Sequence, residues 1–403
     1  MGSASASQLE NGTAGPLRIG VVGLGAVAQA VHLPLLAKHP DRFAVDALCD
    51  LSASTRDALG ERYGVPAARR FADAHELIGA GGLDAIAILT SGSHGSLATA
   101  AARAGLAIFC EKPLAYTLAE LDELEATSPV LQLGYMKLYD PAVERAARVL
   151  AGRPAPRSIE VTVLHPPSAP QLAHAGLLPA PADVDAAVLA GIVAGEAAVN
   201  EAALGAVGAP LASLYSDVLL GSIVHDLAVI RALAGGPLEV DDADVWPGDA
   251  PNGSVSLLGR LPGGTRVSIR WHYLEDYPAY REEVRVHDAS GTVEVVFPAP
   301  YLLHAPTTLT VVEADGEAER TSTTRSTVEA FERQWLAFAA FVAGGETPRA
   351  GLAEGREDVL TCQAAAALLA ARLGVEIGGE AARASFPSRD RLHIVNRPVE
   401  SLL

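Results

Sequence analysis

Aromatic residues and cysteines are scarce in this chain. Phe, Trp and Tyr make up 5% of the 403 residues, so the core must rely on smaller apolar side chains such as Ala, Leu and Val. The three cysteines, Cys49, Cys110 and Cys362, are odd in number and lack CxxC spacing. Such cysteines are typically buried free thiols, which favours a reducing cytoplasm over a disulfide-linked secreted fold.

Basic residues are few relative to acidic ones. The chain has 30 Lys and Arg against 48 Asp and Glu, a formal net charge of −18. Nucleic acid and membrane surfaces are also negative, so we predict neither as a partner. Glu196, Asp217 and Asp226 break the most apolar region before it reaches the ~18 residues of a membrane span. A soluble protein is expected, and a nucleotide cofactor is still allowed because helix amides bind phosphate locally.

Several catalytic motifs are missing. The sequence has no HExxH, no glycine-rich loop ending in a P-loop lysine and no GxSxG, so protease, kinase and esterase functions have no support. Its histidines are scattered without the spacing of metal ligands, and we therefore predict no metal.

The length of the chain exceeds what one hydrophobic core usually supports, so two main domains are expected. Residues 1–16 are small and polar and are expected to form a flexible leader. Over residues 17–135, apolar strand-like segments such as LRIGVVGLG and LDAIAILT alternate with helical ones. This alternation predicts an α/β domain with a doubly wound parallel sheet of the Rossmann type.

The pattern changes over residues 136–380, where longer strand-like segments are separated by turns rather than helices. This predicts an α+β domain with an open mixed or antiparallel sheet. The Pro/Ala/Gly-rich stretch 166–212 is too long for a bare connection, so short helices that cover a site are expected there. Residues 381–403 are expected to be a tail. Further helices are expected at 219–235, 327–343 and 354–373.

A glycine motif opens the first domain. GLGAVA directly follows the strand-like IGVV and places Gly23, Gly25 and Ala28 in the G-x-G-x-x-G/A pattern of dinucleotide-binding folds. Gly23 would permit the tight turn, and Gly25 would let the backbone approach a pyrophosphate. The amides at the start of the following helix, including Ala26 and Val27, would then hold the phosphates.

Asp50 ends the second strand-like segment, 25 residues after Gly25. A carboxylate there can accept hydrogen bonds from the adenosine ribose and repel a 2′-phosphate, so NAD is favoured over NADP. The alternative is that Asp50 caps the next helix, although Ser52 and Ser54 can also serve as the cap.

Four motifs in chain order resemble the Gfo/Idh/MocA family of sugar and cyclitol dehydrogenases: GLGAVA, TSGSH, CEKPLA and GYMKLYDP. The resemblance spans most of residues 17–375 and implies a Rossmann domain joined to an α+β domain. It also implies that Lys112 is the catalytic lysine and that Glu111 lies close to the nicotinamide ribose and carboxamide. Thr90 and His94, the first and last residues of TSGSH, are further cofactor-binding candidates.

The position of Lys112 after a predicted strand also favours a catalytic role. A lysine at the carboxyl end of a parallel strand points into the crevice where such sheets bind ligands. Partial desolvation would lower its pKa toward neutrality and suit it to exchange a proton with a substrate hydroxyl. The alternative is a solvated Glu-Lys pair that ends a strand.

The family's Asp-x-x-x-His signature is incomplete here. His225 aligns with the histidine, but Gly221 stands four residues earlier where the family carries aspartate. His225 is a candidate general base or substrate ligand, or else a histidine satisfied within an apolar helix. Neither Asp217 nor Asp226 is an equivalent replacement for the missing carboxylate.

Other substrate-binding candidates lie nearby. Lys137 stands where the family often places a basic residue beside the substrate, with a surface loop lysine as the alternative. Tyr215 precedes the histidine helix and is a second candidate. Tyr273, Tyr277 and Tyr280 in WHYLEDYPAY could stack on a sugar ring, although packing is the better prediction for most of the tyrosines.

Together these residues predict an NAD-dependent oxidoreductase that transfers a hydride between nicotinamide and a secondary alcohol or ketone of a sugar, sugar derivative or cyclitol. One alternative is a redox-neutral lyase or glycosidase that oxidises its substrate transiently with bound NAD. Another is a non-catalytic NAD-binding protein, against which Lys112 argues. The family resemblance also implies a homo-oligomer, a dimer or tetramer, formed through one face of the mixed sheet.

Overall fold

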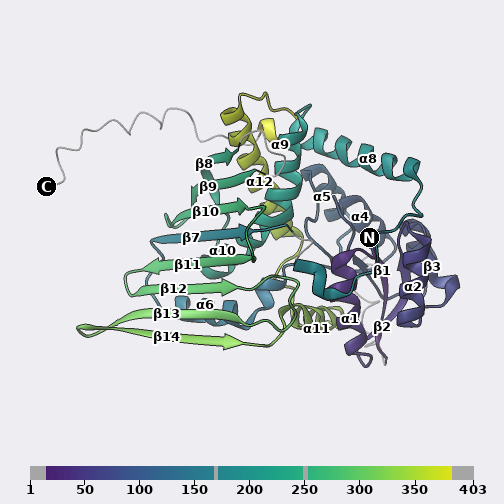
Figure 1. Ribbon diagram of the computed structural model, residues 1–403, viewed down its shortest axis with the longest axis horizontal. Helices are drawn as coiled ribbons and strands as arrows, with labels where there is room; N and C mark the ends of the chain where they lie inside the picture. The colour runs from purple at the N-terminus through teal and green to yellow at the C-terminus, as the bar shows by residue number, and fades with distance from the viewer. Residues whose placement is uncertain (1–14, 168–170, 248–252, 384–403) are drawn as a thin grey trace, which may run out of the picture.

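The computed structural model describes residues 15–167, 171–247 and 253–383. Within these ranges the chain forms two sheets with helices packed against them (Figure 1), which confirms the predicted α/β fold with a Rossmann domain and a second, mixed-sheet domain. The expected leader and tail lie almost entirely outside the described residues.

The first sheet has the strand order β3-β2-β1-β4-β5-β6 and is parallel throughout. The chain reverses its direction of winding between β1 and β4, and the carboxyl ends of those strands form the crevice where such sheets bind ligands. The strands are β1 (Leu17–Val22), β2 (Phe43–Cys49), β3 (Arg70–Phe71), β4 (Ala85–Ile88), β5 (Ala107–Cys110) and β6 (Leu131–Leu133).

Helices connect these strands as the alternation predicted. The helix after the glycine motif begins with a π-helical turn, η1 (Ala28–His32), before α1 (Leu33–Lys38). A capping box starts α5, in which Thr117 and Glu120 satisfy each other's backbone amides. The remaining helical elements are α2 (Ala53–Tyr63), η2 (Ala67–Arg69), α3 (Ala74–Gly79), α4 (Gly95–Arg103), α5 (Leu118–Glu125) and η3 (Met136–Tyr139).

The second sheet has the order β14-β13-β12-β11-β7-β10-β9-β8 and is antiparallel except for the β7–β10 pair. Buried and exposed residues alternate along its central strands, because one face packs against helices. The strands are β7 (Ser158–His165), β8 (Glu239–Trp246), β9 (Ser254–Arg260), β10 (Arg266–Tyr273), β11 (Arg281–Asp288), β12 (Gly291–Phe297), β13 (Thr307–Asp315) and β14 (Ala318–Ser326).

The helices of the second domain include a second π-helix, η5, directly before the helix that carries His225. π-Helical turns are rare and often occur at functional sites. The elements are α6 (Pro141–Ala151), η4 (Ala173–Ala175), α8 (Ala186–Leu204), α9 (Ala209–Ser213), η5 (Leu214–Ile223), α10 (Val224–Ala234), α11 (Ala330–Val342), α12 (Leu352–Leu373) and η6 (Ala381–Arg383).

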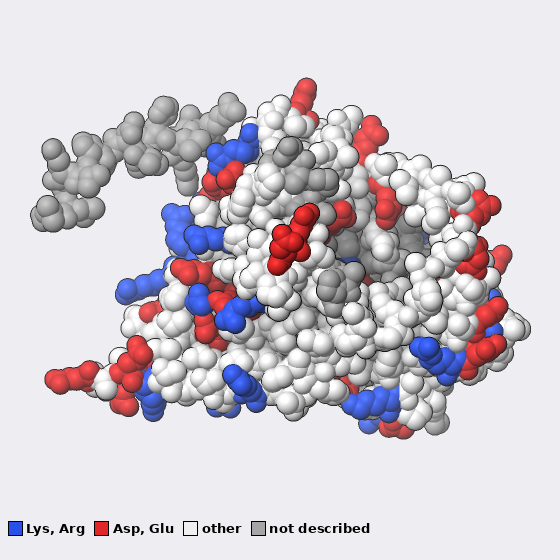
Figure 2. All heavy atoms as spheres, viewed as in Figure 1, with Lys and Arg blue, Asp and Glu red and all other residues white. Residues whose placement is uncertain are grey.

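The stretch 166–212 contains short helical elements as expected, η4 and the start of α9, but it also contains the 19-residue helix α8. By length and composition, α8 is the one helix among the described residues that could span a membrane, and 11% of its apolar window is buried. Val188, Leu189, Ile192 and Val193 are exposed on it. Figure 2 shows a largely uncharged surface over this helix.

The helix α11, which follows the last strand of the second sheet, packs against the first domain. Its Trp335 stacks on Phe109 of β5 with ring centroids 4.0 Å apart, and Phe338 packs edge-on against the same ring. These residues share a core with Leu17 and Val31 of the first domain. The predicted boundary near residue 136 therefore marks a change of sheet rather than a separation of two cores.

Candidate active site

A cleft of about 740 Å³ lies between the carboxyl edge of the first sheet and the face of the second. The glycine loop, the end of β5, the π-helix η5 and the aromatic ends of β10 and β11 all contribute to its walls. The sequence holds three lysines, and two of them, Lys112 and Lys137, line this cleft. Predicted residues that line it are Gly25, Ala26, Val27, Thr90, Glu111, Lys112, Lys137 and His225.

The glycine loop forms the cradle that a dinucleotide pyrophosphate needs. Gly23 has φ +89°, and a Cβ there would lie 2.7 Å from the backbone of Leu89 and Thr90. A Cβ at Gly25 would meet nothing within 4 Å, so this position opens directly into the cleft. The residues present therefore fit a dinucleotide, with the amides of Ala26 and Val27 at the helix start placed to hold its phosphates.

Asp50 lies immediately after β2 and supports this loop. Its Oδ2 accepts a hydrogen bond from the Leu24 amide at 2.9 Å, and its Oδ1 accepts one from the Ser52 amide at 3.0 Å. The cap of α2 is Ser52, whose hydroxyl accepts from the Thr55 amide. The helix-cap alternative for Asp50 is therefore not the one this structure adopts, and its role toward the ribose stays a prediction.

Glu111 is fixed by a residue that the sequence reasoning missed. His32 Nε2 lies 3.2 Å from Glu111 Oε1, while His32 Nδ1 accepts a hydrogen bond from Trp335 Nε1 at 3.1 Å. Burial alone would raise the pKa of Glu111, but the bond from His32 and the nearby Lys112 outweigh it and lower that pKa. The sequence feature that could have identified His32 is its position one helical turn after the glycine motif.

Lys112 extends from the end of β5 across the cleft. Its Nζ donates a hydrogen bond of 2.6 Å to the carbonyl oxygen of Gly221 in η5. Burial lowers its pKa because desolvation disfavours the ammonium; Glu111 opposes this shift and Lys137 adds to it. The lysine is therefore a positioned amine that loses its proton more readily than a solvated lysine, and not the solvated strand-end pair of the alternative.

His94 supports the cleft from behind rather than lining it. It is 1% exposed, and its two ring nitrogens each lie 2.8 Å from a backbone oxygen, those of Glu111 and Thr90. The ring thus joins the ends of β4 and β5. Burial lowers the pKa of His94, and the two backbone bonds only partly offset this effect.

His225 faces the cleft at the start of α10. Among the described residues its Nδ1 has no hydrogen-bond partner, as expected where Gly221 replaces a carboxylate. Burial, with help from Lys137 and Lys112, lowers the pKa of His225 well below its ordinary value. Asp217 also lines the cleft but is exposed and accepts from its neighbour Ser216, so it does not replace the missing carboxylate.

Lys137 is buried and ion-paired rather than a surface loop lysine. Its ammonium bonds to Glu282 of β11, which is 0% exposed and also accepts from Tyr280 Oη at 2.5 Å. Asp226 is buried nearby, and burial together with the Glu282 charge raises its pKa well above the ordinary value. Sequence reasoning missed Glu282, although its inward position in an alternating strand was visible.

Tyr215, predicted as a substrate-binding residue, does not line the cleft. The side chain is 0% exposed and donates its hydroxyl to the Tyr116 carbonyl oxygen at 2.5 Å, so it lies behind the cleft wall and not in it. Its position at the start of η5, on the buried face of this helix, explains this placement. Tyr273 and Tyr280 line the cleft, whereas Tyr277 is exposed.

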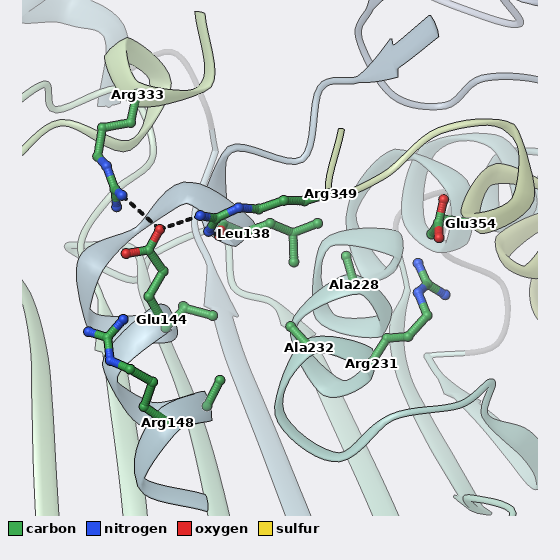
Figure 3. A pocket seen from close by; sticks show the side chains of 11 residues that line it. Leu138, Glu144, Arg148, Ala228, Arg231, Ala232, Arg333, Arg349 and Glu354 are labelled. Carbon is green, nitrogen blue, oxygen red and sulfur yellow. Dashed lines mark hydrogen bonds and ion pairs between the residues drawn. The ribbon is translucent and has the colours of Figure 1, made fainter. Parts of the chain in front are cut away.

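A second hollow, of about 570 Å³, lies between α6, α10 and α11 and is lined by arginines (Figure 3). Arg333 and Arg349 both point at Glu144, with nitrogen–oxygen distances of 2.7 and 2.6 Å. Arg231 pairs with Asp358 at 3.0 Å.

The arginines of this hollow are therefore largely neutralised by carboxylates. Asp358 also accepts a hydrogen bond from Tyr135, whose ring lies edge-on to His225 at 5.8 Å. The ion pairs thus support the wall behind His225.

Comparison with known proteins identifies the first domain. Residues 17–132 match a family described as the oxidoreductase family with an NAD-binding Rossmann fold. The Rossmann domain belongs to the Gfo/Idh/MocA oxidoreductase family. The matched residues contain three of the four motifs, GLGAVA, TSGSH and CEKPLA, and the match confirms the family resemblance for this domain.

Curated relatives of this Gfo/Idh/MocA domain include inositol 2-dehydrogenases. The chain is 34% identical over 130 residues to inositol 2-dehydrogenase of Salmonella typhimurium, covering 31% of this chain and 38% of that protein. Identity to the enzyme of the same name from Paracoccus denitrificans is 36% over 148 residues, covering 34% and 43%. The chain thus spans about two fifths of the length of these relatives.

Solved structures share the fold over most of the chain. A probable dehydrogenase from Thermotoga maritima superposes with a TM-score of 0.62 at 21% identity, covering 88% of this chain and 97% of that one. A 3-ketoreductase from Actinomadura kijaniata in complex with NADP gives 0.64 at 18% identity, covering 87% and 96%. At these identities the likeness shows that the second domain shares the architecture of these proteins. It shows nothing about the activity.

Proposed function

We propose that this protein is an NAD-dependent dehydrogenase that oxidises a secondary alcohol of a sugar, sugar derivative or cyclitol, or reduces the matching ketone. The observation that carries the proposal is the Lys112 amine, held 2.6 Å from the Gly221 carbonyl in a cleft that begins at the glycine loop. The 34% identity to an inositol 2-dehydrogenase supports a polyhydroxylated substrate.

The residues of the cleft divide the chemistry among them. When bound, the nicotinamide supplies the hydride acceptor. Lys112 Nζ takes the proton of the substrate hydroxyl as the carbonyl forms; burial lowers the pKa of this lysine, which favours the neutral amine that the step needs. His225, which is neutral, accepts a hydrogen bond from a neighbouring hydroxyl or donates one to it. Lys137 lines the cleft beside the place where a hydroxylated ring would bind, and the buried Glu282 holds its ammonium from behind.

NAD is proposed over NADP because Asp50 brings a carboxylate to the end of β2. A dimer or tetramer is proposed through the uncovered polar face of the second sheet. A cytoplasmic location fits three free, buried cysteines, and the net charge of −18 argues against nucleic acid and anionic membranes as partners.

The test is reduction of NAD, followed by nicotinamide absorbance, with a panel of inositols, sugars and sugar acids. Turnover with one polyol class supports the proposal. Gly221 favours a second candidate, a redox-neutral lyase or glycosidase, because the usual carboxylate beside His225 is missing. Cleavage of a glycoside without net NADH formation would favour that candidate and overturn the dehydrogenase.

A further inference from the structure

A segment of the second domain crosses onto the first. Residues 171–204, here called the strap, follow β7 and include η4 and α8. Figure 1 shows α8 extending from the second sheet toward the helices of the Rossmann domain. The Leu178 amide of the strap donates to Gln29 Oε1 at 2.9 Å.

Two further contacts fasten the strap. Asp183 Oδ1 accepts from the Ser52 hydroxyl at 2.7 Å, and Asp183 Oδ2 accepts from the Ser54 amide at 2.8 Å. Glu196 packs so closely on Gly92 that a Cβ at that glycine would fall 1.7 Å from Glu196 Oε1.

These contacts follow the line along which a dinucleotide would lie. Gln29 is in the helix directly after the glycine loop, Ser52 follows β2, and Gly92 follows β4. All three positions are at the carboxyl edge of the parallel sheet, where the cofactor of a Rossmann fold binds. The strap therefore contacts three segments of this edge, those that follow β1, β2 and β4.

Asp183 occupies donors that an anion would otherwise use. The Ser52 hydroxyl and the Ser54 amide lie at the N-terminus of the 11-residue helix α2, a setting that attracts negative charge. The bond from Ser52, followed by that from Ser54, lowers the pKa of Asp183 to about 2, so the group is ionised at neutral pH. Asp50 and Asp183 both bond to Ser52, Asp50 to its amide and Asp183 to its hydroxyl, so two carboxylates are anchored to the residue that caps α2.

We propose that Asp183 is a second specificity-determining carboxylate at the adenosine ribose of the cofactor, and that its bonds to Ser52 and Ser54 latch the strap over the bound dinucleotide. The inference rests on the proposed NAD-dependent function. The ligand it selects is a dinucleotide with an unphosphorylated ribose, because a 2′-phosphate would meet the Asp183 charge and find its donors taken. Latching also slows release of the cofactor.

The test compares Asp183→Ala and Asp183→Asn with Asp185→Asn in the whole chain. Asp185 is the matched control, because it lies two residues along the strap and, among the described residues, its carboxylate bonds only to the Ala187 amide within the strap. Calorimetric titration gives the Kd for NAD and for NADP, and stopped-flow displacement gives the release rate of NADH.

We expect Asp183→Ala to tighten NADP binding about 10-fold while changing NAD binding less than about 3-fold, since one negative charge near a doubly charged phosphate is removed in solvent. The same variant releases NADH faster. Asp183→Asn keeps one of the two acceptor oxygens of the latch, so it changes the NADP preference as Asp183→Ala does but speeds NADH release less. Asp185→Asn changes neither quantity.

Two outcomes overturn the idea, and they are distinguishable. A wild-type chain that binds neither dinucleotide refutes the proposed function together with this inference. A wild-type chain that binds NAD, with Asp183→Ala showing the same NAD-to-NADP ratio and release rate, refutes the role of Asp183 alone.

Discussion

Replacing Lys112 with alanine is the most direct perturbation of the proposed chemistry. The substitution removes the amine that bonds to the Gly221 carbonyl oxygen at 2.6 Å and leaves the glycine loop untouched. Proton transfer by a positioned side chain contributes roughly 10²–10⁴-fold to a rate, so we expect kcat to fall by that factor. This loss corresponds to about 3–5.5 kcal/mol of transition-state stabilisation.

The assay follows NADH formation at saturating polyol, together with the Kd for NAD. We expect the Kd to change less than about 3-fold, because the adenosine and pyrophosphate contacts stay in place. Lys38→Ala is the control; Lys38 lies on the surface and pairs with Glu332, away from the cleft. A Lys112→Ala enzyme that keeps more than about a tenth of the wild-type kcat would refute the role of Lys112 as the proton acceptor.

Glu282→Gln should reduce the free energy of unfolding in urea by about 2–4 kcal/mol, because it leaves the buried Lys137 ammonium without its partner; an unchanged midpoint would contradict this. Trp335→Ala should cost about 3–5 kcal/mol, because its ring fills the core that joins α11 to β5. His225 titrates well below its ordinary value of 6.5 in the folded chain, so below that pH the unfolded state binds an extra proton. Stability should therefore fall as pH drops from 7 to 5, by up to about 1.4 kcal/mol per pH unit, and His225→Asn should flatten this slope.

The architecture of the first domain was predictable because its signals are local. Strand and helix patterns alternate, and Gly23 requires its positive φ wherever this turn forms. The strands of the second sheet were harder to predict. β14 carries the almost wholly exposed sequence AERTSTTRS, so no apolar alternation marks it.

The candidate site was only partly predictable, because several of its contacts join residues far apart in the chain. Lys112 and His225 were identified from motifs. The bond between Lys112 and Gly221 spans 109 residues, and the one between Ser52 and Asp183 spans 131. Tyr215 was misplaced because its candidacy rested on sequence proximity to the histidine helix. The buried face of η5 is set by tertiary packing that no local pattern records.

Gly221 leaves Lys112 without the carboxylate of an aspartate at this position, which would raise the pKa of the lysine. A carboxylate beside Lys112 would stabilise the ammonium and raise the pKa of the lysine, whereas the neutral carbonyl oxygen of Gly221 positions the amine without retaining its proton as strongly. The absence of the aspartate thus weakens His225 as a base while favouring Lys112 as one. On this reasoning the lysine carries the proton transfer alone.

Gly221→Asp tests this division of roles. We expect the acid limb of the pH–rate profile for polyol oxidation to move to higher pH by about one unit, because a new negative charge within ~6 Å holds the Lys112 proton. Gly221→Asn is the matched control; its Cβ meets the same Ser216 carbonyl oxygen at 3.0 Å but adds no charge. If Gly221→Asp and Gly221→Asn shift the acid limb equally, the added side-chain volume and not the charge explains the effect. If Gly221→Asp leaves the limb unmoved or moves it to lower pH, the limb does not report loss of the Lys112 proton, and this division of roles is wrong.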